Sequence, residues 1–271
     1  MQAIVALPRQ APESCTTQAL NPDPYSLGCL RDRLIEQELS NPVHGLDVGV
    51  PADRQFAELL ADDQLRLRAE RWAAFLGPRG PRYRECSFSN FEVSGDRARE
   101  KELALETVRE YASDFRAHFA DGNSLLLYGP TGTGKDHLAV AAIKRGVFET
   151  GEKAHWINAQ ELFADFRDAI DNGKGRSEGE AIRGAATPPM LLLSDPLPAT
   201  GELSDFNRSI LYRLIDARYC AKRPTVVTIN IVDGEEALRR LGAATWDRLR
   251  HNARCVPCFW PTYRRPDRGT T

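Results

Sequence analysis

A glycine-rich turn that ends in a lysine is the part of the sequence best suited to chemistry. Residues 129–135 read Gly-Pro-Thr-Gly-Thr-Gly-Lys, and an apolar run at 125–128 precedes them. Glycines let backbone N–H groups close around phosphate oxygens, and Lys135 adds a positive charge near the outer phosphates. A helical pattern begins at the lysine, so its N-terminal dipole also attracts anions. The segment therefore predicts a phosphate-binding loop.

The expected nucleotide contacts run from the first glycine into the helix: Gly129, Pro130, Thr131, Gly132, Thr133, Gly134, Lys135, Asp136 and His137. One position departs from the usual pattern. The residue after the lysine is normally Ser or Thr, whose hydroxyl binds Mg²⁺. Here it is Asp136, so the Mg²⁺ ligands of this site are expected to differ from the usual set.

Two further apolar runs end in polar residues. Residues 190–193 precede Ser194 and Asp195, and a run beginning at 225 ends in Thr228 and Asn230. A carboxylate at the end of a buried strand can hold Mg²⁺ and activate water, and an amide can orient that water. Either pair alone is also compatible with ordinary strand ends. Together, and after a phosphate-binding loop, they predict the second half of a nucleotide site.

Composition excludes several classes of protein. The 271 residues include 36 basic and 38 acidic side chains, so any DNA contact must come from a local basic patch. No apolar stretch approaches the ~20 residues that span a bilayer, and the first residues lack the pattern of a secretory signal. Six scattered cysteines fit a reduced, cytoplasmic setting. We therefore expect a cytoplasmic protein without a membrane partner.

His251, Cys255 and Cys258 form the one sequence cluster that resembles metal ligands. A structural zinc site needs four ligands, and a second Cys-x-x-Cys pair is missing here. The same residues also read as a buried strand, in which cysteine acts as a small apolar side chain. We favour the strand.

The chain divides into two regions at the breaker cluster Gly-Pro-Arg-Gly-Pro at 77–81. Residues 1–82 form the first, in which a polar start up to about Tyr25 is expected to be poorly ordered. Apolar spacing predicts helices over 27–39 and 52–76. This helical segment is the expected partner-binding region, and residues 83–271 form the expected nucleotide-binding domain.

The second region alternates strands with helices. A helix is predicted over 97–119, strands near 124–128, 154–157, 190–194, 225–229 and 255–260, and helices over 135–149, 159–171, 205–220 and 234–250. Asn158, three residues before Glu161, is a candidate N-cap. This alternation is typical of an α/β fold with a parallel sheet covered on both faces.

Residues from about Tyr83 onward resemble the ATPase domain of DnaC/IstB-type AAA+ proteins, the replicative helicase loaders and ATP-binding helpers of transposases. The matching stretches are CSFSNF at 86–91, GPTGTGK at 129–135, LYRLIDARY at 211–219, RPTVVTIN at 223–230, LG at 241–242, DRL at 247–249 and WPTYR at 260–264. The resemblance covers roughly the last two thirds of the chain. It implies a three-layer P-loop AAA+ (ASCE) fold with strand order 5-1-4-3-2. A helical lid is not expected.

The same resemblance assigns roles to individual residues. The implied catalytic residues are Lys135, Asp195, Asn230 as sensor 1 and Arg248 as an arginine finger acting on a neighbouring subunit. Without the resemblance, Arg248 reads as a solvated helix residue. The implied Mg²⁺ ligands are Asp136, Ser194 and Asp195. If Asp195 and not Ser194 takes the metal-side position of the family, Pro196 replaces the catalytic base and hydrolysis should be very poor. Relative to the family, carboxylate and hydroxyl have exchanged places between positions 136 and 194. This is either a compensated site or a degenerate one that binds ATP without hydrolysing it.

The function implied is ATP-dependent loading or remodelling of a replicative helicase on single-stranded DNA, with slow hydrolysis and ATP-dependent homo-oligomers. The alternatives are a transposition helper and a non-hydrolysing ATP-sensing scaffold. A small-molecule kinase would need an acceptor site and a lid for which the sequence offers no candidate. The candidate single-stranded DNA contacts are basic residues before the third strand: Arg167, Lys174, Arg176 and Arg183.

Overall fold

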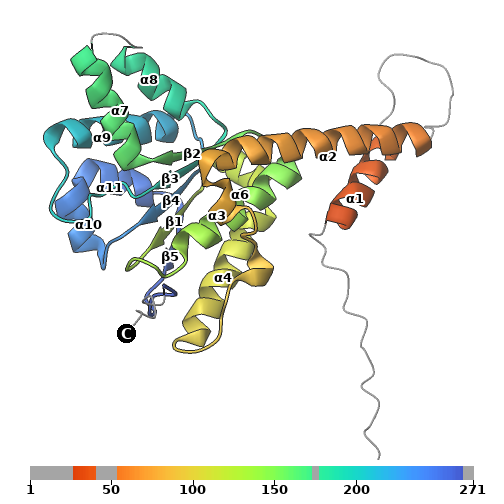
Figure 1. Cartoon of the computed structure of the whole chain (residues 1–271), viewed down its shortest axis with the longest axis horizontal. Coiled ribbons are helices and arrows are strands. Elements are labelled where there is room, and N and C mark those ends of the chain that lie inside the picture. The colour runs from red at the N-terminus through yellow and green to blue at the C-terminus, as the bar shows by residue number, and fades with distance from the viewer. Residues whose placement is uncertain (1–26, 41–53, 173–176, 265–271) are drawn as a thin grey trace, which may run out of the picture.

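A five-stranded parallel sheet lies between two layers of helices (Figure 1). The computed structural model describes residues 27–40, 54–172 and 177–264. The strands are β1 (Ser124–Tyr128), β2 (Ala154–Asn158), β3 (Met190–Ser194), β4 (Thr225–Ile229) and β5 (Ala253–Pro257). Their order is β2-β3-β4-β1-β5, which is the implied order 5-1-4-3-2 read from the other edge. The predicted architecture is therefore confirmed, although β5 begins and ends earlier than the predicted 255–260.

Side chains of the strands alternate between two apolar clusters, one on each face of the sheet. Leu125 and Leu127 of β1 belong to one cluster and Leu126 to the other, as the period of two in a strand requires. The first face is covered by α4 (Ala98–Ser113), α5 (Phe115–Asp121) and α6 (Lys135–Thr150). The second is covered by α7 (Ala159–Asn172), α8 (Glu178–Ala186), α9 (Asp205–Cys220), α10 (Gly234–Leu241) and α11 (Ala243–Arg250). Burial on both faces explains why the three inner strands, β1, β3 and β4, are mostly apolar.

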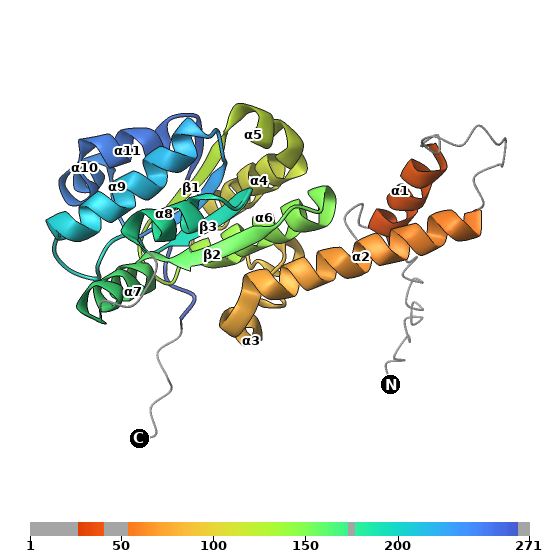
Figure 2. The same ribbon diagram turned by 90° about the horizontal axis from the view of Figure 1, so that it is seen from above.

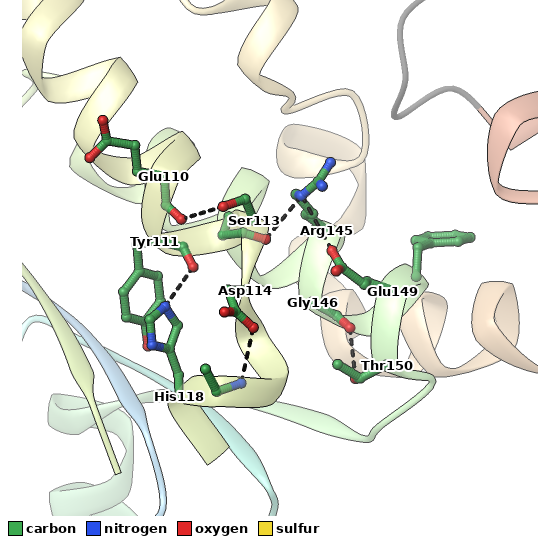
Figure 3. A network of polar contacts seen from close by, with 12 residues as sticks. Glu110, Tyr111, Ser113, Asp114, His118, Arg145, Gly146, Glu149 and Thr150 are labelled. Atoms are coloured by element: carbon green, nitrogen blue, oxygen red, sulfur yellow. Dashed lines mark hydrogen bonds and ion pairs between the residues drawn. The ribbon is translucent and has the colours of Figure 1, made fainter. Parts of the chain in front are cut away.

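Two predicted helices are each divided in the structure. The helix predicted over 97–119 breaks at Asp114, whose carboxylate accepts from Ala117 N at 3.1 Å and caps α5 (Figure 3). Arg145 of α6 donates to Ala112 O at 2.9 Å and so satisfies a carbonyl at the end of α4. The helix predicted over 234–250 breaks at Gly242, where φ is 88°. Left-handed backbone is open to glycine at little cost and ends an α-helix.

α8 was not predicted; it is a short helix of nine residues. Ser177 and Glu180 form a capping box at its start. Arg218 of α9 fixes the neighbouring chain. This arginine is 1% exposed, and its guanidinium donates to the carbonyls of Ala186, Pro188 and Pro224. Its role is structural, since burial of the charged group is compensated by hydrogen bonds on every side.

The N-terminal region is a helical hairpin, here called the arm: α1 (Leu27–Ser40) and α2 (Arg54–Leu76). Both predicted helices are confirmed, and the start of the chain up to Tyr25 lies outside the described residues. α2 projects from the domain, and α1 packs along its far end (Figures 1 and 2). Leu34 and Ile35 pack there against Ala57 and Ala61. None of the helices among the described residues is long and apolar enough to cross a membrane.

The base of the arm is part of the domain's core. Trp72 and Phe75 of α2 belong to the apolar cluster on the α6 face of the sheet. α2 ends at Leu76, before the predicted breaker cluster, and Gly77 has a φ of 47°. A short turn η1 (Gly77–Arg79) and α3 (Gly80–Tyr83) follow and lead into η2 (Phe88–Asn90). The chain thus passes from the arm to the edge of the sheet where β1, β3 and β4 end.

Candidate nucleotide-binding site

The glycine-rich loop connects β1 to α6, as predicted. Gly129 and Gly132 have positive φ values of 144° and 79°. A Cβ on Gly129 would lie 2.4 Å from the carbonyl oxygen of Cys258, and one on Gly132 would lie 1.9 Å from Thr262 Oγ1. Glycine is required at both positions, because the backbone conformation and the space exclude a side chain.

Lys135 is the first residue of α6 and is 6% exposed. Its ammonium group donates to the carbonyl oxygens of Gly129 at 3.0 Å and Pro130 at 2.6 Å. Burial lowers the pKa of Lys135, while the nearby acidic groups Asp136 and Asp195 raise it. The lysine is therefore held inside the loop beside the N-terminus of α6, the arrangement expected for a phosphate site.

Residues 260–263, near the end of the described residues, pack over the loop. Tyr263 N donates to Gly132 O at 2.9 Å, and the indole of Trp260 donates to Thr133 O at 2.8 Å. Thr133 is fully buried, and its hydroxyl donates to Pro130 O at 3.1 Å. The bonds from Tyr263 and Trp260 hold the loop from outside, so its conformation does not depend on glycine content alone.

Two carboxylates are presented at the carboxyl edge of the sheet, each held by a residue of the 228–230 segment. Thr228 Oγ1 donates to Asp136 Oδ1 at 2.7 Å, and Asn230 Nδ2 donates to Asp195 Oδ1 at 2.9 Å. Burial, and secondly the charge of Asp136, raises the pKa of Asp195. The structure therefore brings together Lys135, Asp136, Asp195 and Asn230, all predicted site residues, and adds Thr228 as the hydrogen-bond donor to Asp136.

Ser194 is oriented differently. It is 3% exposed, and its hydroxyl accepts from the indole N–H of Trp156 at 2.9 Å. Asp195, the next residue, turns into the cavity with a φ of 49°, an unusual value for a non-glycine residue. Ser194 thus lies behind the carboxylates, on the side of β2, and not on the cavity wall that the described residues form.

These groups surround a cavity of about 660 Å³. It is lined by Arg82, Tyr83, Cys86, Asn90, Phe91, Glu92, Thr131, Gly132, Gly134, Lys135, Asp136, His137, Asp195, Thr228, Asn230, Tyr263 and Arg264. Residues 82–92 and 263–264 were not predicted at this cavity from the loop and the strands alone. The stretches at 86–91 and 260–264, which match the family and lie outside the sheet, were the signal that could have indicated them.

His137 lies at the junction of the loop and this outer wall. Its ring Nε2 donates to Ser87 O at 2.9 Å, and the ring packs edge-on against Phe91 with centroids 5.5 Å apart. Burial lowers the pKa of His137. The residue therefore fixes the 87–91 segment against α6, a positioning role that the predicted ATP contact did not anticipate.

Arg248 lies on α11, outside the cavity wall formed by the described residues. Its guanidinium donates to Asp216 Oδ1 at 2.6 Å and lies over the rings of Tyr212 and Tyr219, 4.9 and 5.8 Å from their centroids. Arg248 is therefore not among the described residues that line this cavity.

The donor set suits Mg²⁺. The carboxylates of Asp136 and Asp195 face the cavity beside the loop, and Mg²⁺ prefers hard oxygen ligands such as these. No cluster of three or more His, Cys, Asp or Glu side chains arranged to bind a metal exists within the described ranges. Protein groups alone would therefore leave most coordination positions to phosphate oxygens and water, as is usual for Mg²⁺ with nucleotides.

Of the cysteines in the predicted fifth strand, Cys258 is buried and Cys255 is exposed.

The profile of the IstB-like ATP binding protein family matches residues 96–270. The chain belongs to this family. It is 26% identical over 212 residues to a putative ATP-binding protein in an insertion sequence, Rv3427c of Mycobacterium tuberculosis, covering 74% of this chain and 78% of the relative. It is also 26% identical over 186 residues to the uncharacterized protein YdaV of Escherichia coli, covering 68% and 70%.

Solved structures agree on the fold of this IstB-like chain. The crystal structure of the DnaC helicase loader superposes with a TM-score of 0.55 at 23% identity, covering 65% of this chain and 98% of that one. The replication initiator DnaA bound to AMPPCP and single-stranded DNA gives a TM-score of 0.51 at 19% identity, covering 68% and 51%. At these identities the likeness concerns the fold. The predicted resemblance to DnaC/IstB-type AAA+ proteins is thus confirmed.

Proposed function

We propose that this protein is an ATP-dependent loader that delivers or remodels a replicative helicase on single-stranded DNA in the cytoplasm. The observation that supports it best is the site itself. Lys135, two carboxylates and the Thr228 and Asn230 donors converge on one cavity, beside a projecting helical arm suited to hold a partner. In this proposal, the arm holds a client protein and the nucleotide state of the domain controls that contact.

ATP is expected to lie with its phosphates on the loop and its base toward Tyr83 and Phe91, the aromatic residues of the outer wall. Asp136 would hold Mg²⁺, and Asp195 would face the same cavity with its carboxylate left to act on water. The ion would supply positive charge that neutralises the phosphate oxygens. Asp136 lines the same cavity as Lys135, so its carboxylate would face the phosphates and require such a cation.

Hydrolysis is assigned to Asp195 as the base. Asn230 donates to one carboxylate oxygen of Asp195 and fixes its position. The raised pKa of Asp195 favours transfer of a proton to it from an attacking water. Asp195 is one methylene shorter than the glutamate usual at this position, so turnover is expected to be slow. A scaffold that binds ATP without hydrolysing it is the alternative at this step.

ATP-dependent assembly would complete the site. Arg248 is proposed as the finger that acts on the neighbouring subunit's ATP, which requires its release from Asp216. Arg167 and Arg183 are both exposed, as a single-stranded DNA contact requires, and Lys174 and Arg176 lie outside the described residues. The assembled ring or filament would present these arginines in series along the strand.

A transposase is the second candidate partner. The relatives named for insertion sequences, in M. tuberculosis and in Sinorhizobium fredii, favour it. The chain would then serve as an ATP-dependent helper of transposition, with the same nucleotide site and the same arm. The two candidates differ in the client and not in the chemistry.

Client binding separates them. The full-length protein is mixed with ATP and either the replicative helicase of its own organism or a transposase encoded beside it, and complexes are resolved by size-exclusion chromatography. We expect an ATP-dependent complex with the helicase, and helicase-driven unwinding of a DNA fork coated with single-strand-binding protein. Lys135→Ala should abolish both. A complex with the transposase alone would replace the loader proposal with the transposition helper.

A further inference from the structure

Trp156 of β2 joins the base of the arm to the sheet. Its ring stacks on Phe75 at the end of α2, with centroids 5.6 Å apart, and meets Tyr83 of α3 edge-on at 4.8 Å. Arg79 of η1 lies over the same ring at 5.2 Å. Phe75 is stacked in turn on Trp72 at 5.3 Å. The indole is therefore held by three consecutive elements of the chain that leads from the arm to the nucleotide cavity.

The polar edge of the same indole is directed at the nucleotide site. Trp156 Nε1 donates to Ser194 Oγ at 2.9 Å, and Ser194 is 3% exposed. Ser194 is directly followed by Asp195, whose left-handed backbone carries the carboxylate into the cavity. A partly buried hydrogen bond at the last residue of β3 thus fixes the position from which Asp195 departs.

A second set of contacts connects the same two regions through the start of α7. Asn158 caps this helix by accepting from Gln160 N at 3.0 Å and Glu161 N at 3.2 Å, which confirms the predicted N-cap. Gln160 Nε2 donates to Asp195 O at 3.2 Å, while Glu161 forms an ion pair with Arg79 of η1. Arm base and Asp195 are therefore connected by both the indole and the first turn of α7.

We propose that Trp156 is a positioning residue that couples the arm to the nucleotide site. The positions of α2 and η1 determine the orientation of the indole, and the indole determines the position of the Ser194 hydroxyl through their hydrogen bond. Ser194 in turn determines how the carboxylate of Asp195 approaches the metal and the phosphates. Coupling between two binding sites is reciprocal, so nucleotide binding must also order the arm base. The inference deepens the proposed function, in which the arm holds the client, but its test requires only that the chain binds ATP.

A purely structural tryptophan would need its ring and not its N–H group. Trp156→Phe keeps an aromatic ring for Phe75 and Tyr83 and removes the donor to Ser194. Ser194→Ala removes the acceptor of the same bond. Trp72→Phe is the matched control, because it makes the same chemical change in the same aromatic stack without contact to Ser194.

Hydrogen–deuterium exchange of the full-length protein, with and without Mg²⁺ and a non-hydrolysable ATP analogue, tests the coupling. In the wild type and in Trp72→Phe, the analogue should slow exchange in the loop at 129–135 and also at 70–83. In Trp156→Phe and Ser194→Ala, the loop should still be protected, while the protection at 70–83 falls at least about fivefold, the lower end of usual allosteric couplings. The double variant should show no further loss, because both changes remove one bond.

The affinity for the analogue gives a second readout. Trp156→Phe should weaken binding in Mg²⁺ and leave binding in excess EDTA unchanged, whereas a structural defect would weaken both. Protection at 70–83 that survives in Trp156→Phe, or that is absent in a wild type whose loop is protected, would overturn the coupling. Either result leaves the loader proposal intact, because client binding is measured separately.

Discussion

Lys135→Ala is the substitution whose effect follows most directly from the geometry of the loop. The ammonium group is fixed by hydrogen bonds to Gly129 O and Pro130 O, so its charge has a defined place inside the loop. The variant keeps the backbone N–H groups of the loop and loses this charge. Nucleotide affinity should therefore fall sharply while the fold persists.

The magnitude follows from one charge pair. A unit charge ~4 Å from a phosphate oxygen, at an effective dielectric constant of ~20, contributes about 4 kcal/mol. That corresponds to a loss of about a thousandfold in ATP affinity. The free energy of unfolding should change less than the free energy of ATP binding, because removal of the side chain has two opposing effects. Two hydrogen bonds of about 1 kcal/mol each are lost, while a charge that burial disfavours is removed.

Isothermal titration with Mg²⁺ and ATP measures the affinity, and thermal unfolding checks the fold. Lys144→Ala is the control, since Lys144 lies on the same helix and its ammonium group contacts the ring of Trp72 at 5.6 Å, away from the loop. We expect Lys144→Ala to bind ATP like the wild type. An affinity of Lys135→Ala within tenfold of the wild type, with an intact fold, would refute the assignment of the phosphate site.

Three further outcomes are expected. Arg248→Ala should lower ATP turnover by an assembled oligomer about a thousandfold and spare ATP binding, with Arg250→Ala on the same helix as control; normal turnover would remove the finger role. Asp136→Thr and Ser194→Asp should each lose Mg²⁺-dependent ATP binding while the double change keeps it; singles that bind as well as the double would show that the two positions are independent. Asp195→Asn should raise the midpoint of thermal unfolding near neutral pH. Because the pKa of Asp195 is raised in the folded protein, the ionised carboxylate destabilises the fold above that pKa, and the neutral carboxyl group at acidic pH does not. The increase in the unfolding midpoint of Asp195→Asn should therefore vanish in acid. An increase that is independent of pH would contradict this reasoning.

Much of the fold was readable from the sequence because its signals are local. A glycine-rich turn between an apolar run and a helix needs no distant contact to be recognised, and β1, the loop and the start of α6 lie where they were predicted. The order of the strands was predicted only from the family resemblance, because the residues of one strand do not show which distant strand pairs with it. The arm helices were likewise predicted from the spacing of their apolar residues.

The breaks within helices could not be read in the same way. The periodicity of 97–119 continues through Asp114, and only the packing of α5 shows that this residue is a cap. Arg218 reads as a surface residue of α9, yet several carbonyls that converge from other segments make it a buried one. In both cases the deciding groups are distant in the sequence.

The sequence by itself determined that this chain has a phosphate-binding loop, because the loop, Lys135 and the helix are contiguous and their chemistry is local. Tertiary structure decided what surrounds that loop. It directed Ser194 to Trp156, turned Asp195 into the cavity and brought residues 82–92 and 263–264 over the loop. Side-chain direction at a strand end depends on which donors lie across the sheet, and that is fixed only when distant segments pack together.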